Sequence, residues 1–505
     1  MNPLLLTDGY KTSHNKQYPE GTTLVYSNFT PRSNKYAPKG CNEVVVFGTQ
    51  MVMMQLHEMF QKDFFSKPKD EVCGEMKQEL SMYLGSDYDV SHFEALHDLG
   101  YLPINVKSLT EGTKVPIKVP VLTIYNTHPD FYWITNYLET ILSNLLWKPM
   151  TSATISHQYR KVLTKWQEKT DKEKSWFIDW QGHDFSMRGM DSVEAVVSSG
   201  LGHLTSFMGT DSLPTIWGAR KYYGANGSFC GSVPATEHSV MCAGGKEDEV
   251  ETFRRLLETY PTGILSVVSD TWDLWKVCTE HVVTLKEEIL ARDGKLVIRP
   301  DSGDPVDILC GSVNPAYRTG IAGKNRTNWS PEERGVIELL WEIFGGTINE
   351  QGYKVLDPHI GAIYGDSITL DRQIQIYERL EAKGFAATNI VLGVGSFTYQ
   401  MNTRDTLGFA AKGAWFEVKE LVSGDENSEA YYKKTGYDIY KDPITDDGTK
   451  KSLKGLICVT EDHEVLTQCT WEQEAQGILQ TIYEEGRFDN QTSLTKVRNK
   501  LNSIN

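Results

Sequence analysis

Residues 263–305, GILSVVSDTWDLWKVCTEHVVTLKEEILARDGKLVIRPDSGDP, contain the pattern that decides the fold. An apolar run beginning at Gly263 predicts a strand, and the amphipathic stretch after Asp270 predicts a helix that Gly294 closes. A second apolar run, 296–298, predicts another strand. Strand, helix and strand in this order are typical of a parallel sheet, because the helix returns the chain to the same edge.

The end of the second run is unusual, because Leu296, Val297 and Ile298 lead directly into Arg299 and Asp301. Prolines and a glycine in the same loop restrict the backbone there. Two interpretations stay open from these residues alone. The loop is either an exposed turn with solvated charges or a shaped loop that a strand delivers to a cavity.

The same arrangement recurs between residues 175 and 400, in the runs 175–185, 359–367 and 388–398. Strand, loop and helix units in series predict a parallel sheet or an α/β barrel, whose ligand site lies at the carboxyl ends of the strands. The side chains and turns expected to converge at that edge are Asp184, Arg188, Asp270, Arg299, Asp301, Gly365, Asp366 and Gly395.

The flanks of the chain differ from its middle, since both mix short β-rich runs with helices. We expect a barrel over 151–400 and a second, β-rich α+β domain built from 1–150 and 401–505 together. A polar stretch, 423–437, is expected to form a surface loop.

Length and charge limit the classes of function. A chain of 505 residues is long enough for two or three cores, since single cores rarely exceed roughly 250 to 300 residues. The formal net charge of -16 argues against nucleic acid or an anionic membrane as the main partner. An anionic ligand would therefore need basic residues gathered locally. No signal peptide or membrane span is expected, which favours a soluble cytoplasmic protein.

The cysteines point to neither disulfides nor zinc. The eight cysteines are scattered and form no C-x-x-C pair. We expect buried or partly buried free thiols.

The segment SVPATEHSV, 232–240, places His238 beside Glu237. A lone histidine is more often a satisfied structural residue than a catalyst. Proton or group transfer by a histidine needs a carboxylate that fixes its tautomer, and Glu237 or Asp270 could serve.

Other short motifs are weak when taken singly. In GHDFSMRG, 182–189, Phe185 and Arg188 suit a flat ring beside a phosphate, although a core aromatic and a surface charge explain them equally. Asp211 in MGTDS is by default a turn or helix cap. The glycine turns YGDS and GVGS let backbone N–H groups approach an anion, but neither is a Walker A or dinucleotide motif.

Taken jointly, the motifs resemble those of the nicotinamide phosphoribosyltransferases, type II phosphoribosyltransferases related to nicotinate phosphoribosyltransferase. The resemblance extends from residue 4 to residue 443. The motifs that carry it are LLLTDGYKTSHNKQYP (4–19), GHDFSMRG (182–189), GTDS (209–212), KYYG (221–224), SVPATEHS (232–239), SVVSDTWD (266–273), VIRPDSGDP (297–305), YGD (364–366) and TRD (403–405).

The resemblance implies an irregular α/β barrel with a β-rich domain, and a homodimer with two active sites shared across the interface. It implies that nicotinamide reacts with 5-phosphoribosyl-1-pyrophosphate to give nicotinamide mononucleotide and pyrophosphate in NAD salvage. ATP hydrolysis would be coupled through a phosphohistidine, His238. Mg2+ would be bound mainly through substrate phosphates, so no protein metal ligand is assigned.

It also implies roles for individual residues. Phe185 would stack on the base, and Tyr10 of the other subunit, with Asp8 close by, would cover it. Asp211 would accept a hydrogen bond from the NH2 group of the carboxamide. The remaining implied contacts are Arg188 and Arg299 to pyrophosphate and the base pocket, Asp301 to the ribose hydroxyls, Gly365 and Asp366 in a substrate-lining turn, Gly395 and Ser396 in the phosphate cradle, and Arg32, Arg404, Lys412 and Lys441 to phosphates.

Some positions depart from the family pattern. The usual run of glycines reads Gly393, Val394, Gly395, Ser396 here, and Met187 replaces a typical tyrosine. The stretch 424–436 looks inserted. Two other functions remain as alternatives: nicotinate phosphoribosyltransferase, and a catalytically silent nucleotide sensor on the same fold. Asp211 argues against the first, because it would repel the nicotinate carboxylate.

Overall fold

The computed structural model describes residues 1–505 except 313–328, 366, 424–430, 443, 446–451 and 504–505. The chain forms two compact units. Unit 1 comprises 1–154, 219–225 and 402–505, and unit 2 comprises 155–218 and 226–401. The short segment 219–225 lies within unit 1 although it is surrounded in sequence by unit 2.

Unit 2 is built on a parallel sheet, in which each described pair of neighbouring strands runs in the same direction. This confirms the predicted α/β class, because the strands alternate with helices along the chain. The order across the sheet is β7 (Gly209–Thr210), β6 (Gly182–Asp184), β13 (Ile390–Val394), β12 (Ile360–Tyr364), β9 (Asp293–Arg299) and β8 (Thr262–Val268).

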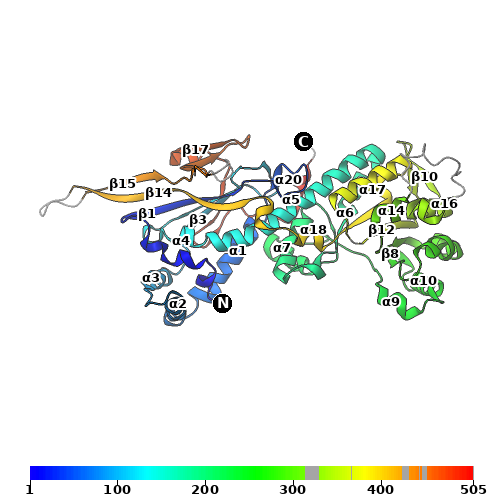
Figure 1. Ribbon diagram of the computed structural model, residues 1–505, viewed down its shortest axis with the longest axis horizontal. Helices are drawn as coiled ribbons and strands as arrows, with labels where there is room; N and C mark the ends of the chain where they lie inside the picture. Colours follow the sequence, from blue (N-terminus) through cyan, green and yellow to red (C-terminus); the bar gives the residue numbers. More distant parts are fainter. Residues whose placement is uncertain (313–328, 366, 424–430, 443, 446–451, 504–505) are drawn as a thin grey trace. The chain divides into compact units, whose positions relative to one another are not determined.

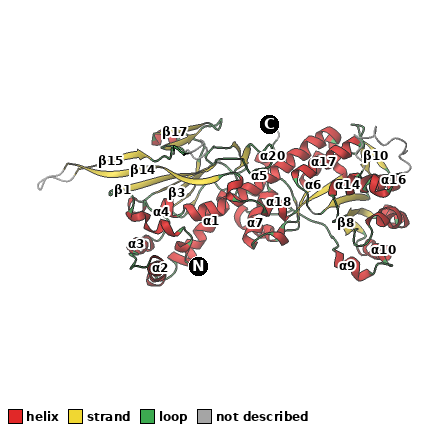
Figure 2. Cartoon of the chain, viewed as in Figure 1, coloured by secondary structure: helices red, strands yellow, loops and turns green. Residues whose placement is uncertain are grey.

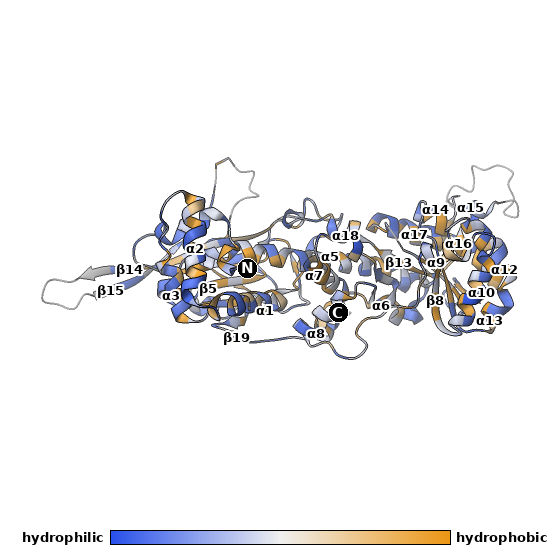
Figure 3. Ribbon diagram, turned by 90° about the horizontal axis from the view of Figure 1, so that it is seen from below, coloured by the Kyte–Doolittle hydropathy of each residue, from blue (hydrophilic) through white to orange (hydrophobic). Residues whose placement is uncertain are grey.

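Helices surround the strands of unit 2 (Figure 2). Figure 3 shows both hydrophilic and hydrophobic residues on them, as expected for helices that bury one face. They are α6 (Ile178–Gln181), α7 (Val193–Leu204), α9 (His238–Gly244), α10 (Glu249–Thr259), α11 (Leu274–Lys276), α12 (Val282–Thr284), α13 (Lys286–Ala291), α14 (Pro305–Cys310), α15 (Pro331–Arg334), α16 (Val336–Phe344), α17 (Leu370–Ala382) and α18 (Ser396–Gln400).

The predicted helix between the first two strands differs from the structure. It is interrupted into α11, a π-helical turn at Val277–His281, α12 and α13, and it ends at Ala291. Gly294 does not close it but lies inside β9. A Cβ on Gly294 would lie 2.0 Å from the Gly263 carbonyl oxygen, so this glycine is needed where β8 and β9 approach closely. In 175–185 the apolar run is likewise mostly helical, and only Gly182–Asp184 form a strand.

Unit 1 contains an antiparallel sheet drawn from both ends of the chain, which confirms the predicted β-rich α+β domain. Strand β1 pairs with β14, nearly 400 residues later, and β3 pairs with β18. The order is β15 (Tyr431–Asp438), β14 (Phe409–Ser423), β1 (Thr22–Pro31), β5 (Leu122–Asn126), β3 (Ile104–Ser108), β18 (Gln480–Glu484) and β19 (Arg487–Phe488).

Smaller strand pairs and helices complete unit 1, and Figure 1 shows α1 to α4 on one side of the large sheet. The pairs are β2 (Glu43–Val45) with β4 (Lys114–Pro116) and β16 (Leu456–Val459) with β17 (Val465–Cys469). The helices are α1 (Thr49–Phe60), α2 (Lys69–Leu84), α3 (Ser91–Leu99), α4 (Ile134–Tyr137), α19 (Trp471–Glu474) and α20 (Leu494–Asn502), while α5 (Glu139–Thr170) and α8 (Pro214–Tyr223) contribute residues to both units.

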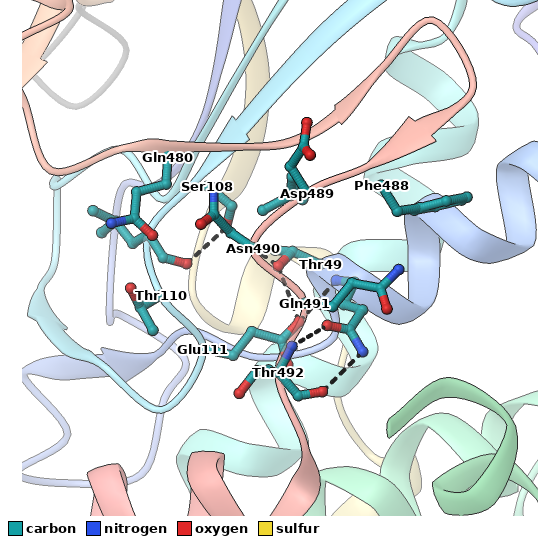
Figure 4. Close-up of a pocket in the computed structure, with 13 residues that line it drawn as sticks. Thr49, Ser108, Thr110, Glu111, Gln480, Phe488, Asp489, Asn490, Gln491 and Thr492 are labelled. Carbon is teal, nitrogen blue, oxygen red and sulfur yellow. Dashed lines mark hydrogen bonds between the residues drawn. The ribbon is translucent and has the colours of Figure 1, made fainter. Parts of the chain in front are cut away.

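A buried carboxylate joins the two flanks inside unit 1 (Figure 4). Glu111 accepts hydrogen bonds from Thr49 Oγ1 (3.0 Å) and the Gln50 backbone N–H (2.8 Å) at the start of α1. The side chain of Gln50 in turn bonds both backbone groups of Thr492, at 2.7 and 3.1 Å. Burial raises the pKa of Glu111. The bond from Gln50 satisfies one of the N–H groups at the start of α1 that lack a partner within the helix, and the Gln50 side chain fixes the C-terminal segment beside it.

All eight cysteines are free, as predicted. Cys242 is exposed, however, and departs from the expectation of buried or partly buried thiols. None of the described helices combines the length and apolarity that a membrane span requires.

Candidate active site

In unit 2, several predicted site residues meet at the carboxyl ends of β6, β12 and β13. Phe185 follows β6 directly, and its backbone N–H donates to the Val394 carbonyl of β13 (3.0 Å). A Cβ on Gly393 would lie 2.8 Å from Phe185 Cδ2 and 2.8 Å from the Gly365 carbonyl oxygen. The missing side chain at Gly393 therefore lets the aromatic ring and the turn after β12 approach each other.

Asp211 is linked to this ring through His183. His183 Nε2 donates to Asp211 Oδ1 (2.9 Å), and the Ser232 hydroxyl donates to the same oxygen. Burial alone would raise the pKa of Asp211, but the bonds from His183 and Ser232 and the charge of Arg299 outweigh it and lower this pKa. Because both bonds use Oδ1, an ionised carboxylate presents Oδ2 to a ligand. The His183 ring lies 4.5 Å from the Phe185 ring, centroid to centroid.

Arg299, at the end of β9, uses only some of its guanidinium N–H groups in hydrogen bonds to the described residues. One Nη donates to the Thr236 carbonyl, while the buried Nε has no hydrogen bond among the described residues. Burial lowers the pKa of Arg299, and the carboxylates of Asp301, Asp211 and Asp270 oppose that shift. A buried guanidinium N–H without an acceptor is costly, which makes this N–H a candidate donor to a ligand.

His238 begins α9 and faces two strand-end carboxylates. Its Nδ1 bonds the Thr271 hydroxyl (3.2 Å), and its Nε2 lies 3.9 Å from Asp270 Oδ1 and 3.8 Å from Asp301 Oδ2. Asp270 is itself fixed, because its Oδ2 accepts from the Asp301 backbone N–H (3.0 Å) and from a neighbouring serine. Glu237 accepts from the Ser239 hydroxyl instead. The imidazole therefore has carboxylates within charge–charge reach and remains about half exposed.

The loop that contains Arg188 packs against Ser396, which follows β13. A Cβ on Gly189 would lie 2.2 Å from Ser396 Oγ, so only a glycine allows this approach. Gly395 precedes α18 and its carbonyl accepts from the Thr398 N–H (3.2 Å). Gly365 is less constrained, since a Cβ there would lie 3.1 Å from Asp301 Oδ1, a tight contact that a small shift of the Asp301 side chain would relieve. Asp366 lies outside the described residues.

The predicted phosphate ligands Arg32 and Lys412 lie in unit 1, where they line one cavity of about 390 Å³. Lys118 and Lys454 line it too, and no acidic side chain does among the described residues. Lys412 also contacts Glu139 (3.1 Å), and Lys454 contacts Asp438 (3.6 Å). In a chain with a net charge of -16, this cavity concentrates positive charge and suits an anion.

Four other predicted residues also lie in unit 1. Tyr10 is 65% exposed, and burial of its hydroxyl, followed by the charge of Asp8, raises its pKa. Arg404 forms an exposed contact with Asp405 (3.4 Å). The Lys441 backbone N–H donates to Ser452 Oγ (2.7 Å), and Ser452 lines the basic cavity. Of the stretch 423–437 expected to form a surface loop, 424–430 lie outside the described residues, and the part from Tyr431 onward instead forms strand β15, which pairs with β14.

Sequence reasoning missed His183, Lys118 and Lys454. His183 sits within a quoted motif and gave no separate signal. Lys118 has a backbone φ of +81°, which no sequence pattern marks for a lysine. Among the described residues, no group of three or more His, Cys, Asp or Glu side chains is arranged to hold a metal ion.

The sequence was compared with known proteins. The model of the nicotinamide phosphoribosyltransferase N-terminal domain matches residues 2–103, and that of the nicotinate phosphoribosyltransferase (NAPRTase) family matches residues 180–487. A nicotinamide phosphoribosyltransferase from Acinetobacter baylyi is 46% identical over 516 residues, which cover 99% of this chain and 97% of that protein. The chain belongs to the nicotinamide phosphoribosyltransferase family. Another nicotinamide phosphoribosyltransferase, from Mycoplasma pneumoniae, is 34% identical over 90% of this chain and 94% of its own.

Solved structures confirm the fold that membership of the nicotinamide phosphoribosyltransferases predicts. Human nicotinic acid phosphoribosyltransferase has a TM-score of 0.52 at 16% identity, covering 98% of this chain and 92% of the human chain. The nicotinate-nucleotide pyrophosphorylase from Pyrococcus furiosus has a TM-score of 0.50 at 14% identity, covering 100% and 97%.

Proposed function

We propose that this chain transfers the phosphoribosyl group of 5-phosphoribosyl-1-pyrophosphate to nicotinamide, giving nicotinamide mononucleotide and pyrophosphate. The observation that carries the choice of base is Asp211, an ionised carboxylate whose Oδ1 accepts from His183 and Ser232, while the His183 ring lies 4.5 Å from the Phe185 ring. A carboxamide donates to such an oxygen, whereas a carboxylate is repelled by it. The test is to incubate the protein with the donor and either base and to identify the nucleotide formed.

The proposed reaction separates positive charge on the ribose from negative charge on pyrophosphate. Arg299 and Arg188 would stabilise the departing phosphates, and Asp301 would accept bonds from the ribose hydroxyls. Phe185 would orient the base by stacking, so that its ring nitrogen faces the anomeric carbon. No general base is needed, because that nitrogen is unprotonated near neutral pH.

Magnesium fits this donor set. Mg2+ is usually held by one or two carboxylates together with substrate phosphates, and Asp301 would be such a carboxylate. When bound, it would supply charge neutralisation to the pyrophosphate. The chain's own residues would position 5-phosphoribosyl-1-pyrophosphate around the Mg2+ ion.

His238 would carry the phosphoryl group that couples ATP hydrolysis to the transfer. Its exposure leaves room for ATP, the bond to Thr271 orients its ring, and the Asp270 carboxylate lies 3.9 Å from its Nε2. A residue that receives a phosphoryl group must combine access with a fixed orientation, and His238 has both.

The active unit would be a homodimer in which each site takes residues from both subunits. Tyr10 is an exposed aromatic on unit 1 whose ring, among the described residues, has only a tilted contact with His14 and the Lys11 ammonium 5.6 Å from its centroid, and it would cover the base bound to the other subunit. The cavity with Arg32, Lys412, Lys118 and Lys454 would receive phosphates of the donor in the same way.

Replacing Asp211 with Asn tests the preference for amide over acid. We expect kcat/KM for nicotinamide to fall by on the order of tenfold or more, because a charge-assisted bond contributes roughly 1.5 to 3 kcal/mol. Use of nicotinate should become measurable, since the Asn amide can rotate to donate to a carboxylate. Both rates are measured at saturating donor.

The matched control for this substitution is Asp293→Asn. Asp293 is an exposed residue at the amino end of β9, away from the carboxyl ends of the strands where the candidate site lies. It should leave the ratio of the two rates unchanged. An unchanged ratio in Asp211→Asn as well would remove Asp211 from the specificity role and favour a nicotinate enzyme.

Lys118 offers a test of the basic cavity. Its φ of +81° is a strained conformation that glycine adopts without steric strain, so Lys118→Gly should stabilise the protein by up to about 1 kcal/mol, less the extra backbone entropy that glycine loses on folding. It should also raise KM for the donor by up to about fivefold, because an exposed charge pair contributes up to about 1 kcal/mol. Thermal unfolding and donor titrations check the two effects.

Lys118→Ala separates them, because it removes the charge but keeps a Cβ in the strained conformation. It should raise KM for the donor without stabilising the protein. If KM for the donor stays at the wild-type value in both variants, Lys118 does not contact the donor.

A further inference from the structure

Glu139, the first residue of α5, lies between two lysines of unit 1. Its Oε2 accepts a hydrogen bond from Lys11 Nζ (2.6 Å), and its Oε1 accepts one from Lys412 Nζ (3.1 Å). A carboxylate is favoured in the first turn of a helix, because the helix dipole is positive there. Each oxygen of one carboxylate therefore holds a different cation, and the two lysines come from the two flanks of the chain.

The first lysine anchors the turn that carries Tyr10. Lys11 and Tyr10 both belong to the short 3-10 helix Gly9–Lys16. The Lys11 ammonium is buried, donates to the Asn136 carbonyl (3.0 Å) as well as to Glu139, and lies 5.6 Å from the centroid of the Tyr10 ring. A buried ammonium is normally paired with a carboxylate, and Glu139 supplies that charge. The ion pair thus holds the turn that presents Tyr10.

The second lysine belongs to the basic cavity of unit 1. Lys412, on β14, is half-exposed and lines this cavity, whereas Glu139 is not among its described lining residues. Pairing with Asn28 of β1 fixes the Lys412 backbone, but a lysine ammonium sits on a long flexible stem. The bond to Glu139 Oε1 restricts where this ammonium lies. The cation is therefore already placed when a phosphate binds, which lowers the entropy lost on binding.

We propose that Glu139 is a positioning residue for both substrates: it holds Lys412 for the phosphates of the donor and, through Lys11, holds Tyr10 for the base. The inference rests on the proposed function, in which Lys412 and Tyr10 contact the two substrates. One carboxylate serves both lysines because it has two acceptor oxygens.

Glu139→Gln distinguishes positioning from a simple effect of charge. An amide has one acceptor oxygen and one NH2 group, so it cannot accept from both lysines. We expect the oxygen to stay with the buried Lys11, which leaves the NH2 group facing the Lys412 ammonium. Kd for the donor, measured by titration calorimetry, should rise by up to about fivefold, as the loss of an exposed ion pair implies. Removal of a negative charge alone would lower this Kd, so an unchanged or lower Kd would overturn the proposal.

Lys11→Met tests the link to Tyr10. It removes the ammonium that anchors the turn and leaves Glu139 bonded to Lys412. KM for nicotinamide should rise by up to about tenfold, the contribution of one aromatic contact, while kcat and Kd for the donor stay at the wild-type values. A fall in kcat with KM for nicotinamide unchanged would show that Lys11 serves only the stability of the fold, and the proposed link to Tyr10 would be wrong.

The double variant Glu139→Gln/Lys11→Met guards against unfolding. Glu139→Gln alone leaves a buried ammonium without its counter-charge and should lower the melting temperature, whereas the double variant lacks both charges and should recover it. Its Kd for the donor should stay raised, because Lys412 still lacks the carboxylate. Donor binding as tight as in the wild type would contradict the positioning role.

Glu20→Gln, at an exposed glutamate of unit 1, is the matched control and should change neither Kd for the donor nor KM for nicotinamide. Calorimetry with the donor does not depend on which base reacts. A failure of the proposed function would appear instead as no nicotinamide mononucleotide from the wild type, so the two failures are distinguishable.

Discussion

A chain carrying His238→Ala is expected to lose ATP hydrolysis and the phosphoenzyme completely while still forming nicotinamide mononucleotide slowly without ATP. The imidazole is the accessible nitrogen base at this edge, held by Thr271 and facing Asp270 and Asp301. The groups proposed to bind the base and the donor, including Asp211 and Arg299, are elsewhere in the sheet and remain. Labelled ATP followed by acid treatment measures the phosphoenzyme, and product analysis measures the transfer.

Thr271→Val is the matched control, because it removes the bond to Nδ1 but keeps the imidazole. It should slow phosphorylation and still yield acid-labile phosphate. If His238→Ala accumulates acid-labile phosphate, another residue is the carrier and the assignment of His238 is wrong.

Mixing two inactive chains should restore activity if the sites are shared. Tyr10→Ala removes the ring proposed to stack over the base. Arg299→Ala removes the cation proposed to bind the departing phosphates. In a heterodimer of the two, one site receives both intact residues. With random pairing, about a quarter of wild-type activity is expected, because half of the dimers are mixed and one of their two sites is intact. Activity is measured after the mixed dimers have been verified.

The double variant Tyr10→Ala/Arg299→Ala mixed with wild type provides the reverse control. If sites are shared, its heterodimers have no intact site, whereas sites within one chain would leave one. Recovery with the double variant and none with the single variants would contradict shared sites.

The sequence predicted the architecture well where pattern and structure share a physical cause. Apolar runs that end in turn residues became β8, β9, β12 and β13, because strands buried on both faces read as continuous apolar segments. The interrupted helix after Asp270 was not predictable, since the amphipathic period continues through its π-helical turn. Gly294 resembled a helix stop but is required by the contact with Gly263, which only the folded sheet reveals.

The sequence could predict individual residues of the site but not the contacts between them. Motif resemblance identified Phe185 and Asp211, but not that His183 donates to Asp211 from the neighbouring strand. The basic cavity joins β1, β14 and loops more than 300 residues apart, so Lys118 carried no local signal. Long-range pairing and backbone strain arise only on folding, and single-sequence patterns do not encode them locally.

The measurement that tests the central claim most directly is product analysis with the donor, Mg2+ and either nicotinamide or nicotinate, each with and without ATP. Chromatography identifies the nucleotide and pyrophosphate formed. We predict nicotinamide mononucleotide from nicotinamide in both conditions, faster with ATP, and little product from nicotinate. Preferential formation of nicotinate mononucleotide, or no nucleotide from either base, would contradict the proposed function.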